Sequence, residues 1–449
     1  MKSAQIKLRD NGDVKISDDV AMKLRRYAGL RLDVLCDENP SLLIFPNCLG
    51  DNGDRINEGR LFSLNGDCLS VGNIVGFWGV DDVNVRVHSR FDMDDRQYFF
   101  HYMLQRICKV NVIDMQTLPD EEDLWDFLIY LFPMALKGAM RQGIFRAYRV
   151  FRYDDDQVRG AIDVARYIRH DIPFSGRVSY STREHTADNH MIQLVRHAVE
   201  FIRRRAPGIL SVDGEMRQAV DTIVQLTPDY SEKSRQRIMA ANLRPVRHPY
   251  YSAYTGLQRI CLQILRHEKI AFGENDGRIC GIVFDAAWLW EEYLNSLFEG
   301  DKGFTGVVHP MNKTCQNPVY FFEPKRGPHY PDFYDEKRRV VMDAKYKNPD
   351  NGIPREDLFQ LISYIHVMAY RSGMLLYPSH ATGFHDEGRL KGLGGRIGWA
   401  SLMVPKVADL AEFRDFAAAI STQEGDFLRL LKEHDYTLIP EISGINDPR

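Results

Sequence analysis

The stretch PDFYDEKRRVVMDAKYK, residues 331–347, decides the expected fold of this 449-residue chain. Within residues 339–346 the side chains alternate in character at period two, which predicts a β-strand. Successive side chains of a strand point to opposite faces of its sheet, so Asp343 and Lys345 are expected to share one face.

The residues just before this strand predict a hairpin. Residues 335–338, DEKR, are typical of a turn, and a first strand would begin near Asp332. Asp332 would then lie opposite Val341, with Asp343 as its diagonal neighbour roughly 7–8 Å away. A divalent cation bound by oxygens at about 2.0–2.1 Å can join two such carboxylates. With Lys345 beside them to orient or deprotonate a water or to neutralise phosphate charge, the segment predicts a metal-dependent hydrolase acting on a polyanion.

A third acid is expected from residues 284–298, FDAAWLWEEYLNSLF, whose apolar side chains recur at helical spacing. Glu291 falls on this apolar stripe, whereas Glu292 does not. An ionised carboxylate among apolar neighbours is costly without a partner, so Glu291 is preferred as the acid that joins the metal site.

The residues that follow continue the pattern. Residues 357–370 predict a helix in which Gln360 and Tyr364 are one turn apart on one face. Residues 374–378 predict a buried strand that ends at Pro378. The order helix, hairpin, helix, strand favours a compact α/β domain.

Each of these features alone has an ordinary explanation. A strand that ends in D-x-K is usually a solvated edge, and a helical Glu or Gln usually lies at the surface. The order of the features along the chain favours an active site. A chance arrangement, or a nuclease-type fold kept only for structure, remains the alternative.

This arrangement resembles the PD-(D/E)XK nuclease superfamily, and more closely the McrC-like subunits of McrBC-type, 5-methylcytosine-specific restriction systems. The resemblance implies a nuclease domain with a mixed central sheet, and Mg²⁺ as cofactor with Mn²⁺ as a substitute. The site residues that it implies are the metal ligands Asp332, Asp343, Glu291 and the Ala344 carbonyl, together with the catalytic residues Lys345 and Gln360.

The resemblance extends beyond the nuclease segment. Residues 71–91 are similar to a strand pair of the family's amino-terminal domain, RGAID at residues 159–163 to its R-G-x-I signature, and residues 181–199 to its polar tail running into a helix. One departure is Ser89-Arg90, where the family often has Pro-Lys or Pro-Arg. The detail of that partner-facing loop is therefore left open.

The resemblance also implies partners. McrC-like proteins act with an McrB-like AAA+ GTPase, stimulate its hydrolysis, and cut double-stranded DNA. The chain contains no G-x4-G-K-[ST] phosphate loop of its own, which fits such a division of labour. Two alternatives remain: a non-catalytic adaptor that regulates an AAA+ motor, and a stand-alone DNA-repair nuclease.

Charge and composition narrow the function classes. A chain with 44% hydrophobic and 27% charged residues is typical of a soluble protein with two or three domains. A net charge of −4 is not that of a free-standing DNA binder, so a partner is expected to hold the substrate. Basic residues do gather near the proposed site, where they either touch DNA or form a solvated face. They are Lys325, Arg326, Lys337, Arg338, Arg339, Lys345 and Lys347.

Neither a membrane span nor a disulfide framework is expected. The longest strongly apolar run, residues 127–136, is broken by Pro133, and a span needs roughly 20 apolar residues. The amino terminus lacks the apolar core of a signal peptide, which favours the cytoplasm. The seven cysteines show no C-x2-C pairing, so neither a disulfide framework nor a zinc site is predicted.

The chain is expected to be a multi-domain α+β protein. Residues 1–100 predict a small β-rich, partner-contacting domain, residues 101–275 a mainly helical middle region, and residues 276–449 the nuclease domain. In the middle region Arg146, Arg149 and Arg152 are spaced as on one face of a helix, which either binds an anion or, as is more usual, faces solvent.

Overall fold

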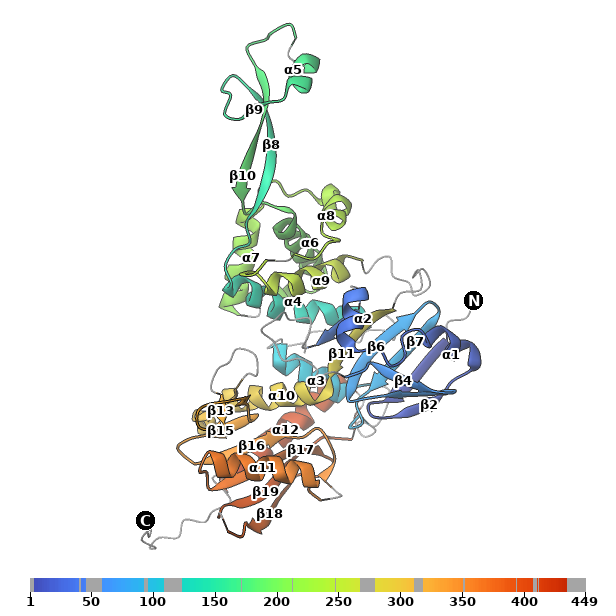
Figure 1. Ribbon diagram of the computed structural model, residues 1–449, viewed down its shortest axis with the longest axis vertical. Helices are drawn as coiled ribbons and strands as arrows, with labels where there is room; N and C mark the ends of the chain where they lie inside the picture. Colours follow the sequence, from blue (N-terminus) through green and yellow to red (C-terminus); the bar gives the residue numbers. More distant parts are fainter. Residues whose placement is uncertain are drawn as a thin grey trace. The chain divides into compact units, whose positions relative to one another are not determined.

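The computed structural model describes residues 4–39, 42–45, 59–92, 96–108, 123–170, 172–211, 213–246, 248–266, 279–310, 318–349, 352–392, 394–406, 410 and 412–433. These residues form a mixed α+β fold, as expected (Figure 1). The chain divides into two compact units, one made of residues 1–116 with 270–449 and the other of residues 117–269.

The first unit contains a mixed sheet that joins the two ends of the chain. Its strands, in spatial order, are β1 (Ala4–Arg9), β7 (Val83–His88), β6 (Ile74–Val80), β11 (Ile279–Asp285) and β3 (Leu42–Phe45). The strand pair expected within residues 71–91 is β6 and β7, which pair antiparallel. β11 comes from the carboxyl-terminal region, yet it pairs with β6 and β3. The regions expected as 1–100 and 276–449 therefore share one sheet.

Smaller elements complete the amino-terminal part of this unit. A three-stranded sheet and two helices pack on the core, and these elements are β2 (Asp13–Lys15), β5 (Cys68–Val71), β4 (Phe62–Asn65), α1 (Asp18–Leu24) and α2 (Leu32–Glu38). A further helix, α3 (Tyr98–Cys108), packs against α10 (Ala286–Gly300). Trp78 of β6 lies in this core and stacks on Phe62, with ring centroids 4.6 Å apart.

A second mixed sheet carries the segment 331–347. Its strands, in order, are β12 (Val307–Val308), β15 (Phe333–Asp335), β16 (Val340–Ala344), β17 (Ser372–Ser379), β19 (Arg396–Met403) and β18 (Gly383–Arg389). β16 confirms the predicted strand; it pairs antiparallel with β15 and parallel with β17. The strand expected to end at Pro378 is β17, but it pairs with β19 as far as Ser379. That end was predicted wrongly, because proline removes one amide donor without preventing the next residue from pairing.

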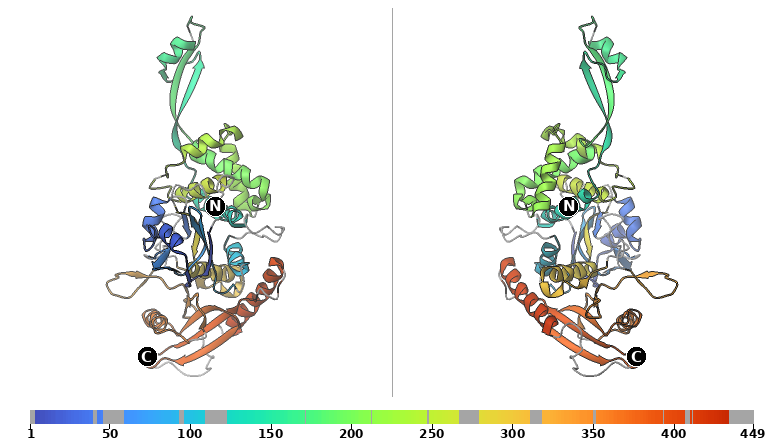
Figure 2. Two further views of the ribbon diagram at one scale, coloured as in Figure 1. Left: turned by 90° about the vertical axis from the view of Figure 1, so that its right-hand side faces the viewer. Right: turned by 90° about the vertical axis from the view of Figure 1, so that its left-hand side faces the viewer.

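Helices cover both faces of this sheet. They are α10 (Ala286–Gly300), the short 3-10 turn Lys302–Phe304, α11 (Arg355–Val367) and α12 (Phe413–Glu433). α11 packs Leu361 and Ile365 against Val341 and Leu375, and Figure 2 shows α12 on the opposite face from α11. A small hairpin of β13 (Val319–Tyr320) and β14 (Pro328–His329) precedes β15.

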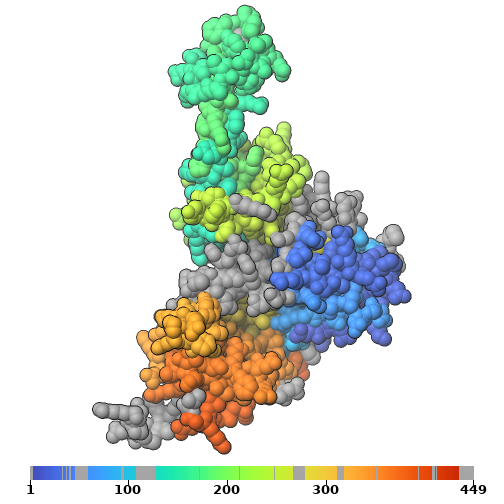
Figure 3. Space-filling view, in the orientation of Figure 1, coloured from blue at the N-terminus to red at the C-terminus, as the bar shows by residue number. Residues whose placement is uncertain are grey.

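The second unit combines a helical base with a long β-ribbon. Its elements are α4 (Asp123–Arg141), β8 (Ala147–Asp155), β9 (Ala161–Ile162), α5 (Val164–His170), β10 (Val178–Thr186), α6 (His190–Arg205), α7 (Gly214–Leu226), α8 (Arg235–Ala241), α9 (Ala253–Arg266), and the 3-10 turns Pro207–Ser211 and Glu232–Ser234. Within this unit, β9 and α5 lie at the end of the ribbon away from the helical base (Figure 1). The space-filling view shows this end as a compact knob on a narrower stem (Figure 3). Across the described segments, no helix combines the length and apolar composition that a membrane crossing requires.

The ribbon corrects one expectation for the middle region. Arg149 and Arg152 lie in β8, which pairs antiparallel with β10 along its whole length, so they do not share a helix face with Arg146. Burial alternates along β8 at period two, because its aromatic and β-branched side chains suit a pleated strand. The i, i+3 spacing of these arginines therefore did not predict the secondary structure of the segment.

Candidate active site

The turn that joins β15 to β16 runs from Glu336 to Arg339. Asp335 starts it, because its Oδ1 accepts hydrogen bonds from the backbone N–H groups of Lys337 (2.9 Å) and Arg338 (3.0 Å). Arg339 ends it with a φ of 54°. Each end of the turn therefore lies one residue later than the expected 335–338.

This shift places Asp332 beside Asp343. Phe333 pairs with Met342, so the residue before Phe333 falls next to the residue after Met342. Asp332 Oδ2 accepts a hydrogen bond from the backbone N–H of Ala344 at 2.7 Å. The predicted pairing of Asp332 with Val341 is thus wrong, although the two aspartates do share a face. They are direct neighbours across the strands rather than diagonal ones.

The two carboxylates lie in an environment that disfavours their charges. Asp343 is 1% exposed, and burial raises its pKa despite the nearby Lys345. Burial and the charge of Asp343 together raise the pKa of Asp332. Because burial raises the pKa of both acids, a nearby cation is needed before both can ionise.

Lys345 provides one positive charge. Its Nζ lies 2.6 Å from Asp343 Oδ2 and donates a hydrogen bond to Gln360 Oε1 at 3.1 Å. Burial lowers the pKa of Lys345, but the charges of Asp343 and Asp332 outweigh it, and the net shift is upward. The ammonium form is held in place, so Lys345 acts here as a cation and a hydrogen-bond donor.

α11 presents a row of side chains to this site. Gln360 and Tyr364 do lie on one face, as predicted, and they are hydrogen-bonded to each other. Burial raises the pKa of Tyr364 to about 12, and the bond from Gln360 opposes this shift. The phenol therefore stays protonated at neutral pH.

Asp357 is a member of the site that was missed from the sequence. It is 8% exposed, forms an ion pair with Lys347, and lies 3.8 Å from the Nζ of Lys345. Its position was available in principle, because Asp357 precedes Gln360 by three residues and so extends the same helical row back by one turn.

The expected helical acid lies near a histidine. Glu291 Oε1 is 3.7 Å from Nδ1 of His309, and Glu292 Oε1 is 3.7 Å from its Nε2. The side chains of Glu291 and Glu292 are 21% and 19% exposed, so Glu291 lies at the edge of the apolar face. The two exposures are nearly equal and therefore do not indicate which glutamate is the metal ligand. The choice of Glu291 stays a prediction.

His309 connects these glutamates to Asp332. Its Nδ1 donates a hydrogen bond to the Asp332 carbonyl at 2.7 Å, and its ring stacks on Phe333 at 4.9 Å. Burial lowers the pKa of His309, but Glu292 and Asp332 outweigh it, and the net shift is upward. Nothing in the sequence distinguished His309 from the other dispersed histidines.

The aspartate pair fits part of a divalent-cation site. Over the part of the chain that the structure describes, no three or more His, Cys, Asp or Glu side chains are arranged to hold a metal. Both carboxylate oxygens of Asp343 are nevertheless buried without a hydrogen-bond partner, apart from the ion pair with Lys345. Mg²⁺ commonly binds through only one or two carboxylates and keeps several waters. Asp332 and Asp343 fit that pattern, whereas Glu291 and the Ala344 carbonyl stay predicted ligands.

The Ser89-Arg90 pair contacts this site from the amino-terminal sheet. Ser89 is fully buried, and its hydroxyl is 2.6 Å from the hydroxyl of Tyr346, the residue after Lys345. The guanidinium of Arg90 lies 5.5 Å from the centre of the Tyr346 ring. Ser89 is therefore engaged inside the first unit and is not available to a partner.

Replacing Tyr346 by phenylalanine tests this contact. Tyr346→Phe removes one of the two hydrogen bonds of the Ser89 hydroxyl, which still accepts a bond from the backbone N–H of Phe91 at 3.0 Å, so we expect the free energy of unfolding to fall by about 1 kcal/mol. Urea denaturation followed by tryptophan fluorescence measures the change. Tyr250→Phe, at a residue that is 81% exposed, is the matched control. Equal stability of the two variants would show that the buried contact contributes nothing.

Three comparisons relate the chain to known proteins. The model of a family described as "McrBC 5-methylcytosine restriction system component" matches residues 69–378, which is more than half of the chain. No curated protein sequence matches the chain significantly.

Solved structures resemble the chain at low identity. One is a chain of a half-complex from the tetradecameric assembly of Thermococcus gammatolerans McrB AAA+ hexamers with bound McrC, at 16% identity and a TM-score of 0.45, with 93% of this chain and 100% of that chain covered. Another is from the Thermococcus gammatolerans McrBC complex, at 15% identity and a TM-score of 0.31, with 68% of this chain and 90% of that chain covered.

Proposed function

Because the chain belongs to the family of McrBC 5-methylcytosine restriction system components, we propose that it is the DNA-cleaving subunit of such a system. It would hydrolyse phosphodiester bonds of double-stranded DNA in the cytoplasm and stimulate an McrB-like AAA+ GTPase. The observation that carries this proposal is the pair of half-buried Asp332 and buried Asp343 with Lys345 beside it.

The residues of the site divide the chemistry between them. Asp332 and Asp343, with Glu291 and the Ala344 carbonyl, would hold Mg²⁺ or its substitute Mn²⁺, an ion that polarises phosphoryl oxygens and makes bound water more acidic. The Lys345 ammonium, held by Asp343 and Gln360, would neutralise charge that develops on the phosphate.

The remaining side chains position these groups. Gln360 presents its amide between Lys345 and Tyr364 and would orient the attacking water or a phosphate oxygen. Asp357 draws the positive charges of Lys347 and Lys345 toward α11. His309 supports the backbone of Asp332 through its carbonyl. Such fixed geometry is what gives hydrolytic sites their rate advantage.

The far end of the β-ribbon is the surface that we propose for the GTPase partner. Exposed apolar side chains gather there, and they are Val158 (43%), Ile162 (53%), Val164 (60%), Ile168 (60%), Ile172 (60%) and Phe174 (66%). Contiguous exposed apolar surface marks interaction sites in soluble proteins. In residues 1–100, where the sequence placed the partner contact, the described large apolar side chains that are exposed are Met22 and Val34.

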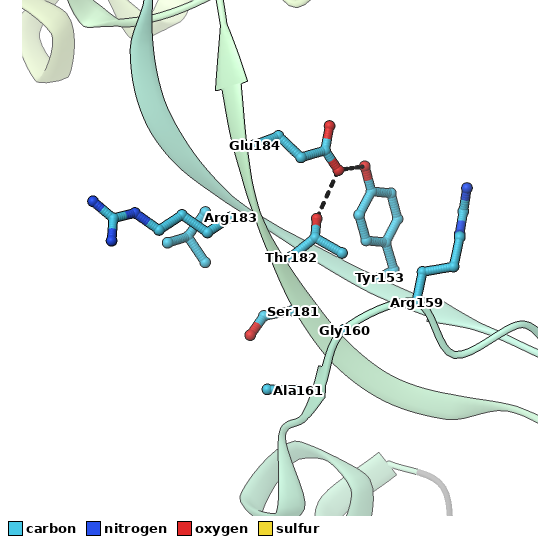
Figure 4. A pocket seen from close by; sticks show the side chains of 9 residues that line it. Tyr153, Arg159, Gly160, Ala161, Ser181, Thr182, Arg183 and Glu184 are labelled. Carbon is cyan, nitrogen blue, oxygen red and sulfur yellow. Dashed lines mark hydrogen bonds between the residues drawn. The ribbon is translucent and has the colours of Figure 1, made fainter.

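The R-G-x-I segment builds a shallow cavity of about 600 Å³ on this ribbon (Figure 4). Arg159 lines it beside Tyr153, and both Tyr153 and Thr182 donate hydrogen bonds to Glu184 (3.2 and 2.7 Å). A Cβ on Gly160 would run into the carbonyl oxygen of Ser181, so only glycine allows this approach to β10. The cavity adds polar groups to the same proposed partner surface.

A reconstituted cleavage assay tests the proposal. The chain is mixed with its AAA+ partner, GTP, Mg²⁺ and a duplex that carries 5-methylcytosine, and we expect cuts that require every component. EDTA should stop cleavage, and excess Mg²⁺ or Mn²⁺ should restore it. Stimulated GTP hydrolysis without any cut would instead identify a non-catalytic adaptor. Cleavage without the motor would identify a stand-alone nuclease.

A further inference from the structure

We propose that the β13–β14 hairpin is a DNA-contacting ribbon that holds duplex DNA beside the Asp332 and Asp343 site. This inference rests on the proposed nuclease function and names the surface that would grip its substrate. The hairpin consists of Val319–Tyr320, Pro328–His329 and the loop of residues 321–327 between them. Figure 2 shows it projecting from the sheet and helices around it.

The base of the hairpin rests on the candidate active site. Phe321 stacks on His329 with ring centroids 4.0 Å apart, and it meets the ring of Tyr364 edge-on at 5.8 Å. Tyr364 is hydrogen-bonded to Gln360, which accepts a hydrogen bond from Lys345. A continuous series of contacts therefore joins the hairpin to the catalytic lysine.

The chain path also limits how far the loop lies from the site. His329 is three residues before Asp332, and Lys325 is seven residues before it. Seven extended residues span at most about 25 Å. A phosphate held by the loop would thus lie within about one helical turn of duplex, roughly 34 Å, of the bond next to Asp332.

The loop exposes an aromatic ring. Phe322 is 60% exposed, and residues 322–328 are exposed throughout. Leaving so much of a phenylalanine in water forgoes most of the free energy that its burial would provide. In the major groove of DNA, a phenylalanine ring can make apolar contact with the methyl group of thymine. A DNA groove would cover this ring.

The same loop carries two basic residues whose charges are not neutralised nearby. Lys325 places its Nζ 5.3 Å from the centre of the Tyr320 ring, and Arg326 follows it in the exposed loop. Among the described residues neither forms an ion pair, whereas Lys345 and Lys347 both pair with carboxylates. With Glu323 as the one acid, residues 321–327 carry a net charge of 2 − 1 = +1 in a chain of net charge −4.

These features match a DNA duplex in shape and charge. The major groove is about 12 Å wide and admits a two-stranded β-ribbon. Lys and Arg at the tip of such a ribbon contact phosphates, which hold the protein in register without reading sequence. The hairpin therefore supplies non-specific grip near the scissile bond, while sequence or methylation is read elsewhere.

The test removes both positive charges. Lys325→Gln/Arg326→Gln is assembled with the AAA+ partner in the Asp343→Asn background, and its affinity for a fluorescein-labelled methylated duplex is measured between 50 and 200 mM salt. We expect weaker binding, with a slope of log K against log salt that is shallower by about 1.8, because each lost phosphate contact contributes about 0.9. Stimulation of GTP hydrolysis and the melting temperature should not change, because both residues are exposed.

The matched control removes two charges from another turn. The control is Lys337→Gln/Arg339→Gln, at two residues in the turn before β16, at the end of that strand away from Asp343. It removes two positive charges, the same number as the hairpin variant. Equal weakening by both pairs, or an unchanged salt slope in the hairpin variant, would overturn the proposal. In the otherwise wild-type chain, cleavage must be present and must fall with Lys325→Gln/Arg326→Gln. If the wild-type complex never cuts DNA, the proposed nuclease function fails instead.

Discussion

Asp343→Asn is expected to lower DNA cleavage by about 10³-fold or more while stimulation of the partner's GTPase stays at the wild-type level. Asp343 is the most deeply buried acid of the site, and its carboxylate holds Lys345 and faces Asp332. An amide of the same size keeps the shape but removes the charge that a divalent cation needs. Initial rates of duplex cleavage and of GTP hydrolysis, measured in the same mixture, give both values.

Asp335→Asn is the control for this prediction. Asp335 is buried in the same hairpin but at its other end, where it accepts hydrogen bonds from the turn and pairs with Arg338. Its replacement should lower stability yet leave the rate of cleavage by folded protein unchanged. Loss of cleavage and of GTPase stimulation together in Asp343→Asn would count against separate nuclease and regulatory surfaces.

Ile168→Ser/Phe174→Ser is expected to lower both GTPase stimulation and motor-dependent cleavage by about 30-fold or more. These side chains are 60% and 66% exposed at the far end of the ribbon. Apolar anchors of an interface commonly contribute about 2 kcal/mol or more, which corresponds to about 30-fold in affinity. Since both side chains already face solvent, the melting temperature of the isolated chain should not fall. Titrating the GTPase with the variant measures the loss.

The control distinguishes two placements of the partner surface. Met22→Ser/Val34→Ser removes the exposed apolar side chains described in residues 1–100, which are 67% and 39% exposed. It should leave stimulation unchanged. If this variant loses stimulation and the ribbon variant does not, the partner binds the amino-terminal domain, as the sequence suggested, and the ribbon has another role.

Much of the candidate site followed from local patterns. Alternation predicted β16, and the turn signal DEKR predicted its hairpin with β15 to within one residue. Helical spacing put Gln360 and Tyr364 on one face of α11. These features depend on residues only a few positions apart, which is the range over which periodicity and turn chemistry act.

The errors arose where one side chain changed the backbone. Asp335 bonds to the N–H groups of Lys337 and Arg338, so it begins the turn while it remains in β15. The register moved with it, and Asp332 came directly opposite Asp343. The prediction for Arg149 failed in a similar way. Its spacing from Arg146 and Arg152 is typical of a helix face, but the aromatic and β-branched residues around it favour the strand β8.

By itself the sequence determined the local elements of this protein and the acids and lysine that share a strand face, because those follow from spacing along one backbone. Only the tertiary structure brought β11 into the amino-terminal sheet, Ser89 against Tyr346, and His309 between Glu291 and Asp332. Each of these contacts joins residues far apart in the chain. Their free energy comes from burial and pairing after folding, so no local pattern marks them beforehand.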